Sequence, residues 1–124
     1  MSFPEINIAI VSRYLPDQSD TSQKKYAFTY SVTITNVGKL GAQLIARHWI
    51  IVDSENKMHE VKGLGVVGKQ PFLNPGESFE YSSWTVIATP AGSMRGIYIC
   101  MTEDCVSFEV PIPEFVLAMP KSLH

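Results

Sequence analysis

The sequence predicts an all-β protein that folds as an antiparallel β-sandwich, and three observations support this prediction. Apolar and polar residues alternate with a period of two along several segments, whereas the period of an amphipathic helix is almost absent. Turn-forming residues recur about every 8–12 residues, which divides the chain into roughly seven to nine short strands. A chain of 124 residues can also bury a core of its own. A closed small barrel is the alternative arrangement of such strands.

The composition excludes several classes of protein. With 45% hydrophobic and 18% charged residues, the chain is not a disordered tail, a coiled coil or a collagen-like rod. Ten Lys and Arg against twelve Asp and Glu give a net charge of -2, which offers no positive field for nucleic acid or an anionic membrane. No apolar run approaches the roughly 20 residues of a membrane helix. We expect a single domain over residues 1–124 that binds neither nucleic acid nor membrane.

The first residues and the cysteines indicate the compartment. Residues 1–5 have no basic segment followed by an apolar stretch, as a signal peptide would. Cys100 and Cys105 are too few for a disulfide framework, although they flank a turn across which they could face each other. We expect a cytoplasmic protein with two free thiols; a redox pair is the alternative.

The first strands show the clearest alternation. Ile6, Ile8 and Ile10 share one face of a strand that fades toward Tyr14, and a polar loop over residues 15–22 follows. From residue 26, apolar and small side chains point to opposite faces of a half-buried antiparallel strand. The side chains predicted to be buried are Tyr26, Phe28, Tyr30, Val32 and Ile34. The side chains predicted to be exposed or on a second face are Ala27, Thr29, Ser31, Thr33 and Thr35.

A central strand is predicted next. Residues 36–41 are rich in types that tolerate positive φ and form a turn. Residues 43–52 are apolar on both faces except at Arg47 and His48, which indicates a central strand or one whose outer face is covered. A turn and a short strand over residues 58–62 follow.

A type II turn is predicted over residues 74–77. Pro75 fixes φ at its second position, and Gly76 supplies positive φ at its third. Phe79 and Tyr81 then alternate inward along the next strand.

Apolar residues alternate in each of the last two strands. They are Ile97, Ile99 and Met101 in one strand, and Val106, Phe108, Val110 and Ile112 in the other. Pro111 and Pro113 have the opposite parity, and proline cannot donate to a strand ladder. The last strand is therefore expected at the edge of a sheet.

Several linked motifs carry a resemblance to a known family. They are Arg47-x-Trp49, Val61-x-Gly63-x-Gly65-Val66-Val67-Gly68-x-x-Pro71, Pro75-Gly76-x-x-Phe79-x-Tyr81-x-Ser83, Met94-x-Gly96-x-Tyr98 and Phe108-x-x-x-Ile112-Pro113-x-Phe115-x-Leu117. With these motifs in this order, most of the chain resembles the ApaG family. Two positions depart from it, since Leu64 stands where the family typically has an acidic residue and Trp84 where it typically has glycine.

The resemblance implies an immunoglobulin- or fibronectin type III-like β-sandwich. Bacterial members of the family are small stand-alone proteins, and similar domains in eukaryotic F-box and polymerase-delta-interacting proteins look like protein-interaction modules. The family is loosely linked with cobalt and magnesium tolerance, and its name ties it to a diadenosine tetraphosphate hydrolase operon. No enzymatic activity is established for it as a class.

The segment Gly63-x-Gly65-x-x-Gly68 has the glycine spacing of the dinucleotide-binding fingerprint but not its structural context. That fingerprint needs a helix after the glycines to direct N–H groups at a pyrophosphate, and no helical pattern follows Gly68. We predict a structural bend in which Gly65 or Gly68 has positive φ or lies against a neighbouring backbone. The alternative is an anion-binding loop made by Gly63, Gly65, Gly68 and Lys69.

No catalytic or metal-binding constellation is recognisable. His48, His59 and His124 do not lie at ligand spacing, so we expect no metal and no cofactor. The serine of the segment 92–96 follows its glycine directly, unlike the G-x-S-x-G elbow, and Glu77 and Glu80 point to opposite faces of a strand. The sequence therefore predicts a protein that is not an enzyme.

An apolar surplus indicates an interaction surface. Trp84 has the opposite parity to Phe79 and Tyr81, so it faces away from the core unless a loop of its own chain covers it. Phe115 and Met119 lie in the predicted edge strand over residues 110–119, and an exposed edge invites strand addition by another chain. We predict a binding module with a protein or peptide partner, or a weak homodimer; the alternative is an accessory protein that binds a nucleoside polyphosphate at Gly63–Gly68.

Overall fold

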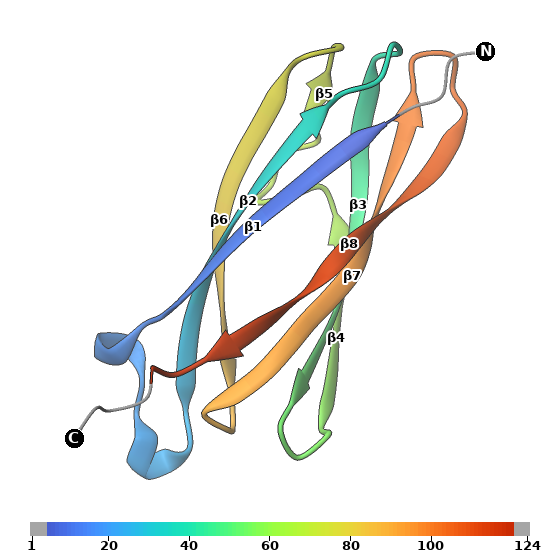
Figure 1. The fold of residues 1–124 in the computed structure, drawn as a ribbon. Coiled ribbons are helices and arrows are strands. Elements are labelled where there is room, and N and C mark those ends of the chain that lie inside the picture. The colour runs from blue at the N-terminus through green and yellow to red at the C-terminus, as the bar shows by residue number, and fades with distance from the viewer. Residues whose placement is uncertain (1–4, 121–124) are drawn as a thin grey trace.

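Two antiparallel sheets face each other in the computed structural model, which describes residues 5–120 (Figure 1). One sheet has the order β1-β2-β6, and the other has the order β4-β3-β7-β8 with β5 also paired to β3. The strands are β1 (Ile6–Tyr14), β2 (Tyr26–Asn36), β3 (Ala42–Asp53), β4 (Met58–Leu64), β5 (Phe72–Leu73), β6 (Ser78–Ile87), β7 (Ala91–Thr102) and β8 (Ser107–Ala118). The predicted β-sandwich is confirmed, and β3 is central as expected.

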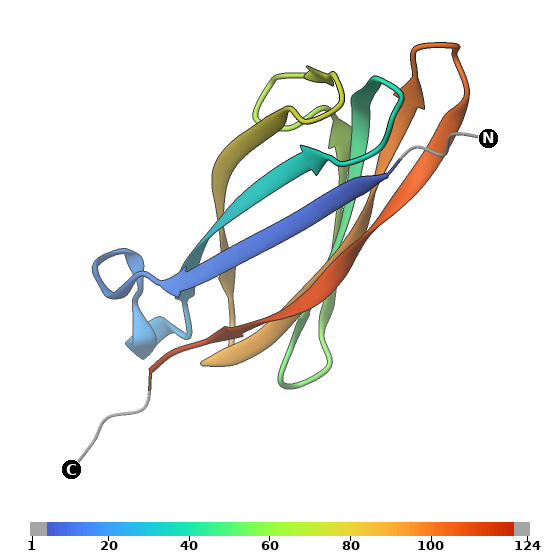
Figure 2. The ribbon, with the colours of Figure 1, turned by 45° about the horizontal axis from the view of Figure 1, so that its top comes forward.

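The sandwich is open along its sides and does not close into a barrel. Figure 2 shows β1 running close to β8, which belongs to the other sheet. The Ser12 hydroxyl on β1 donates to the Val116 carbonyl on β8 at 3.0 Å, yet no ladder joins the two strands. β8 pairs with β7 alone, and Pro111 and Pro113 on it are exposed. The predicted edge strand is therefore confirmed.

The alternation of β2 builds the centre of the core. Phe28, Val32 and Ile34 are almost completely buried, Tyr30 is buried, and Tyr26 is half-buried. The opposite face is half-exposed as predicted, with one exception. Ala27 is fully buried because the segment after β1 folds over it. The Ala27 carbonyl accepts from the Leu15 amide, and the Ala27 amide donates to the Ser19 hydroxyl, both at 2.8 Å.

Aromatic rings join the two sheets. The indole of Trp49 on β3 meets the ring of Tyr30 on β2 edge-on, with 5.5 Å between centroids. The hydroxyls of Tyr81 on β6 and Tyr98 on β7 form a buried hydrogen bond across the sandwich. Burial raises the pKa of Tyr81 to about 12, and burial also raises the pKa of Tyr98. Both phenols are therefore neutral wherever the protein is folded at moderate pH.

Irregularities in β3 and β7 reset which side chains face inward. The β3–β7 register shifts between Leu44 and Ala46. Before the shift, even-numbered side chains such as Leu44 face the interior; beyond it, odd-numbered side chains such as Trp49 do. On β7, Ile97 and Ile99 alternate as predicted but lie half-buried on the outer face, while Tyr98 takes the interior. Alternation alone did not distinguish these two faces, because both carry apolar residues.

The two cysteines do not meet. In the β7–β8 ladder, Cys100 is opposite Phe108, whereas Cys105 lies in the turn that joins these strands. Cys100 is buried, Cys105 is exposed, and both are free thiols. Burial raises the pKa of the Cys100 thiol to about 11. The predicted free thiols are therefore confirmed, and the arrangement across a hairpin is wrong.

Candidate binding surface around Trp84 and Arg47

Trp84 stands on the outer face of the three-stranded sheet, as its parity predicted. Its side chain is 66% exposed, so residues 5–120 leave most of the indole open. The strand registers place Arg13, Thr29 and Trp84 in one row across β1, β2 and β6. A cation, a hydroxyl and a large aromatic ring thus follow one another across the outer face of this sheet.

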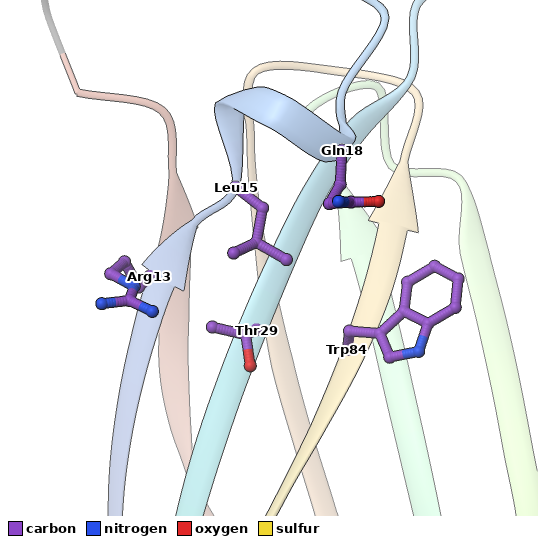
Figure 3. A pocket seen from close by; sticks show the side chains of 5 residues that line it. All are labelled: Arg13, Leu15, Gln18, Thr29 and Trp84. Atoms are coloured by element: carbon purple, nitrogen blue, oxygen red, sulfur yellow. The ribbon is translucent and has the colours of Figure 1, made fainter.

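The row forms the floor of an open hollow of about 460 Å³. Figure 3 shows Leu15 and Gln18 projecting from the segment after β1, above Thr29, with Arg13 and Trp84 on either side. Gln18 belongs to the short helix η1 (Pro16–Gln18). Because the bonds to Ala27 hold this segment on β2, the hollow has a defined wall.

The glycine segment is a continuation of β4 followed by a tight turn. β4 extends through Leu64, beyond the predicted end at residue 62. The Val66 amide donates to the Lys69 carbonyl at 2.8 Å, and the Lys69 amide donates back to Val66 at 2.9 Å. The two residues between them, Val67 and Gly68, both have positive φ, which is the geometry of a type I′ turn.

The structural prediction for the glycines is confirmed. Gly65 has φ +65° and lies against the Lys69 carbonyl, while Gly68 has φ +77°. The Gly65 amide donates to the Ile45 carbonyl at 2.7 Å, so it is engaged within the chain. No helix follows the glycines among the described residues. Anion binding by Gly63, Gly65, Gly68 and the exposed Lys69 stays a prediction.

Gly63 and its neighbours hold the guanidinium of Arg47. Arg47 is opposite Gly63 in the β3–β4 ladder. Its Nη1 donates to the carbonyls of Leu64 at 3.0 Å and Gly65 at 2.9 Å. A Cβ on Gly63 would approach Arg47 Nη1 to 2.8 Å, so the missing side chain leaves room for the guanidinium. Sequence reasoning missed this site, although Arg47 was a visible charge in an apolar strand.

The guanidinium faces a small crevice on the open side of the sandwich, between β6 and the β3–β4 pair. The crevice has a volume of about 130 Å³. Its lining includes Tyr30, Arg47, Val61, Ser83, Trp84 and Thr85. Burial raises the pKa of Tyr30, against smaller lowering effects from a Ser83 hydrogen bond and the charge of Arg47. Trp84 borders both this crevice and the hollow on the outer face.

The other predicted contact residues lie elsewhere. Phe115 is half-buried, and its ring meets Trp49 edge-on at 5.9 Å, which is a core position. Met119 is half-buried, and its amide donates to the Pro90 carbonyl at 2.8 Å. The structure therefore does not bring Phe115, Met119 and Trp84 together into one surface.

The histidines and acids form a cross-strand pair and scattered surface groups. His48 Nε2 lies 2.9 Å from a Glu60 carboxylate oxygen on the neighbouring strand. His59 is exposed, and His124 lies outside the described residues. Between residues 5 and 120, no three His, Cys, Asp or Glu side chains gather as metal ligands would.

The same part of the chain contains no helix of the length and apolarity needed to cross a membrane.

Comparisons with known proteins agree on one family. The family model described as "ApaG domain" matches residues 16–102. "Protein ApaG" of Ralstonia nicotianae is 57% identical over the whole of both chains, and that of Bordetella pertussis is 55% identical over 97% of this chain and 92% of its own. A B. pertussis crystal structure, described as an ApaA protein, matches with a TM-score of 0.93 and 54% identity over 96% of this chain and 97% of its own. A second X-ray structure matches with a TM-score of 0.89 and 41% identity over 96% and 90%. The chain therefore belongs to the ApaG family.

Proposed function

We propose that this protein is a cytoplasmic, non-enzymatic binding module that contacts a protein or peptide partner through the surface around Trp84. The observation that carries the proposal is the exposed indole at the side of an open hollow that Arg13, Leu15 and Thr29 also line. Exposed tryptophan and arginine are the side chains most enriched where protein interfaces gain their affinity. An indole left largely in water is a favourable surface for a partner to cover.

The hollow suits a side chain or a short segment of a partner. Its volume of about 460 Å³ is within the usual range for ligand sites, and Leu15 and Trp84 give it an apolar character. Arg13 and Thr29 add donors that can fix the orientation of a bound segment. The arrangement supports recognition of a partially apolar segment.

A pair of charge-introducing variants tests the proposal. Tagged wild-type protein, Trp84→Glu and Val106→Glu would be used to capture partners from the native host, and each captured protein would then be purified and titrated directly. Val106 is the matched control, because it is 57% exposed, lies between β7 and β8, and lines neither the hollow nor the crevice. We expect a stoichiometric partner that binds the wild type and Val106→Glu but binds Trp84→Glu at least about tenfold more weakly.

The proposal fails if Trp84→Glu binds every purified partner as tightly as the wild type. A titration with ATP and diadenosine tetraphosphate, with and without magnesium, addresses the alternative function. Saturable shifts of the amides from Gly63 to Lys69 would support a polyphosphate-binding accessory protein instead.

A further inference from the structure

The crevice beside Arg47 contains a positive charge that no acidic side chain among residues 5–120 neutralises. Within residues 5–120, the ion pairs join His48 to Glu60 and Arg95 to Glu114, and Arg47 takes part in neither. Arg47 Nη1 is occupied by the two carbonyls of the glycine segment, which leaves the N–H groups of Nε and Nη2 without a hydrogen-bond partner in that range. An unpaired, half-buried guanidinium is an attractive site for an anion.

The free donors are open to solvent. No buried side-chain nitrogen or oxygen between residues 5 and 120 lacks a hydrogen-bond partner. Since Arg47 is only half-buried, its unpaired N–H groups must therefore be reached by water. The guanidinium is also held in place by two carbonyls and by the space above Gly63, so little side-chain freedom is lost when an anion binds.

The size and charge of the crevice select its ligand. Its volume of about 130 Å³ accommodates a single small group. Among the described residues, Arg47 is the one cation that lines it, while Ser83 and Thr85 contribute hydroxyls. One guanidinium with a planar fork of donors matches one planar carboxylate, whereas a polyphosphate would bring several negative charges to a protein of net charge -2.

We infer that the Arg47 crevice binds a carboxylate group, supplied by an Asp or Glu side chain or the C-terminus of the partner. Trp84 borders both the crevice and the hollow, so one bound segment can place an acidic group on Arg47 and an apolar group beside Trp84. The inference rests on the proposed function for the source of the carboxylate, but the site itself can be tested without a partner.

The test is an NMR titration of the ¹⁵N-labelled protein with sodium acetate. Sodium chloride at equal ionic strength and the neutral isostere acetamide are the control ligands. We expect saturable acetate shifts at Arg47 Nε–H and at the amides of Gly63 and Ser83, and no such shifts with either control. Arg47→Gln should weaken acetate binding by about tenfold or more, whereas Arg95→Gln should leave it unchanged.

A second pair of variants covers the case in which Arg47→Gln fails to fold. Val61 lines the crevice and is 40% exposed. Val61→Glu would supply an internal carboxylate and displace acetate, while Val61→Gln is its neutral match. Acetate binding that is absent, or equal in both variants of either pair, would overturn the inference.

Inorganic phosphate provides the last arm of the experiment. Saturation by phosphate at a concentration at least about tenfold below that of acetate would overturn the carboxylate assignment in favour of a phosphate ligand. If acetate fails but a partner still depends on Trp84, the inference alone is wrong. If acetate binds but no partner depends on Trp84, the proposed function alone is wrong.

Discussion

The side chain of Arg47 occupies the space that Gly63 leaves empty on the neighbouring strand. Nη1 of Arg47 would lie 2.8 Å from a Cβ at Gly63, and it is anchored by the carbonyls of Leu64 and Gly65. Gly63 therefore provides space for a neighbouring side chain, whereas Gly65 and Gly68 allow the backbone to adopt positive φ. This difference has consequences for stability.

Alanine substitutions of the three glycines should destabilise the protein to different degrees. Gly65→Ala should cost the most, about 2 kcal/mol or more, because φ is +65° and a Cβ would overlap the Lys69 carbonyl. Gly68→Ala should cost about 1 kcal/mol, since φ is +77° but nothing lies within 4 Å. Gly63→Ala should cost least, because φ of Gly63 is not positive and only the end of the Arg47 side chain must shift, with weakening of its hydrogen bonds to Leu64 and Gly65. Urea unfolding measures this order, and unchanged midpoints for Gly65→Ala and Gly68→Ala would refute it.

The buried Tyr81–Tyr98 pair should make the protein sensitive to alkaline pH. The pKa of Tyr81 is raised from 10.0 to about 12, chiefly by burial, so the folded state holds its proton more tightly than the unfolded state. The stability that this group contributes is fully present below pH 10 and is lost as pH rises from 10 toward 12. Urea midpoints measured between pH 8 and 11 should fall above pH 10, and less steeply in Tyr81→Phe. An identical decline in the variant would contradict this assignment.

The two thiols should react at very different rates. Cys105 is exposed, whereas Cys100 is buried and its pKa is raised to about 11, which suppresses the nucleophilic thiolate. We expect iodoacetamide at pH 8 to alkylate Cys105 in the folded protein and Cys100 only after unfolding. Mass spectrometry of the alkylated peptides provides the measurement. Equal labelling of both residues in the native protein would show that β7 opens readily.

Weak self-association is expected through the exposed apolar and edge features. β8 is an edge strand that pairs with β7 alone, although β1 lies beside it through the Ser12–Val116 hydrogen bond, and Trp84 presents a largely exposed indole on the other sheet. Sedimentation velocity at micromolar concentration should reveal a reversible dimer that weakens in Trp84→Glu and persists in Leu64→Glu. A concentration-independent monomer in all three proteins would exclude a homodimer in this range and leave a different chain as the partner.

The sequence by itself determined features that depend on one strand or one turn. Alternation over β2 identified Phe28, Val32 and Ile34 as core residues, because side-chain direction along a strand has a period of two. Gly76 has φ +87° at the third position of the turn predicted from Pro75, since proline and glycine restrict φ locally. Parity alone also predicted that Trp84 faces outward, because the direction of a side chain on a regular strand follows from its position in that strand.

Only the tertiary structure decided features that depend on contacts between distant segments. The register shift between Leu44 and Ala46 determines that Arg47 lies on the interior side of β3, and a one-residue slip reverses the direction of every side chain beyond it. Phe115 lies in the core because its ring packs against Trp49, which is distant in the sequence. The Arg47 crevice is lined from both sheets, by Ser83 and Thr85 on β6 and by Arg47 and Val61 on the β3–β4 pair, and no local pattern encodes how the two sheets lie relative to each other.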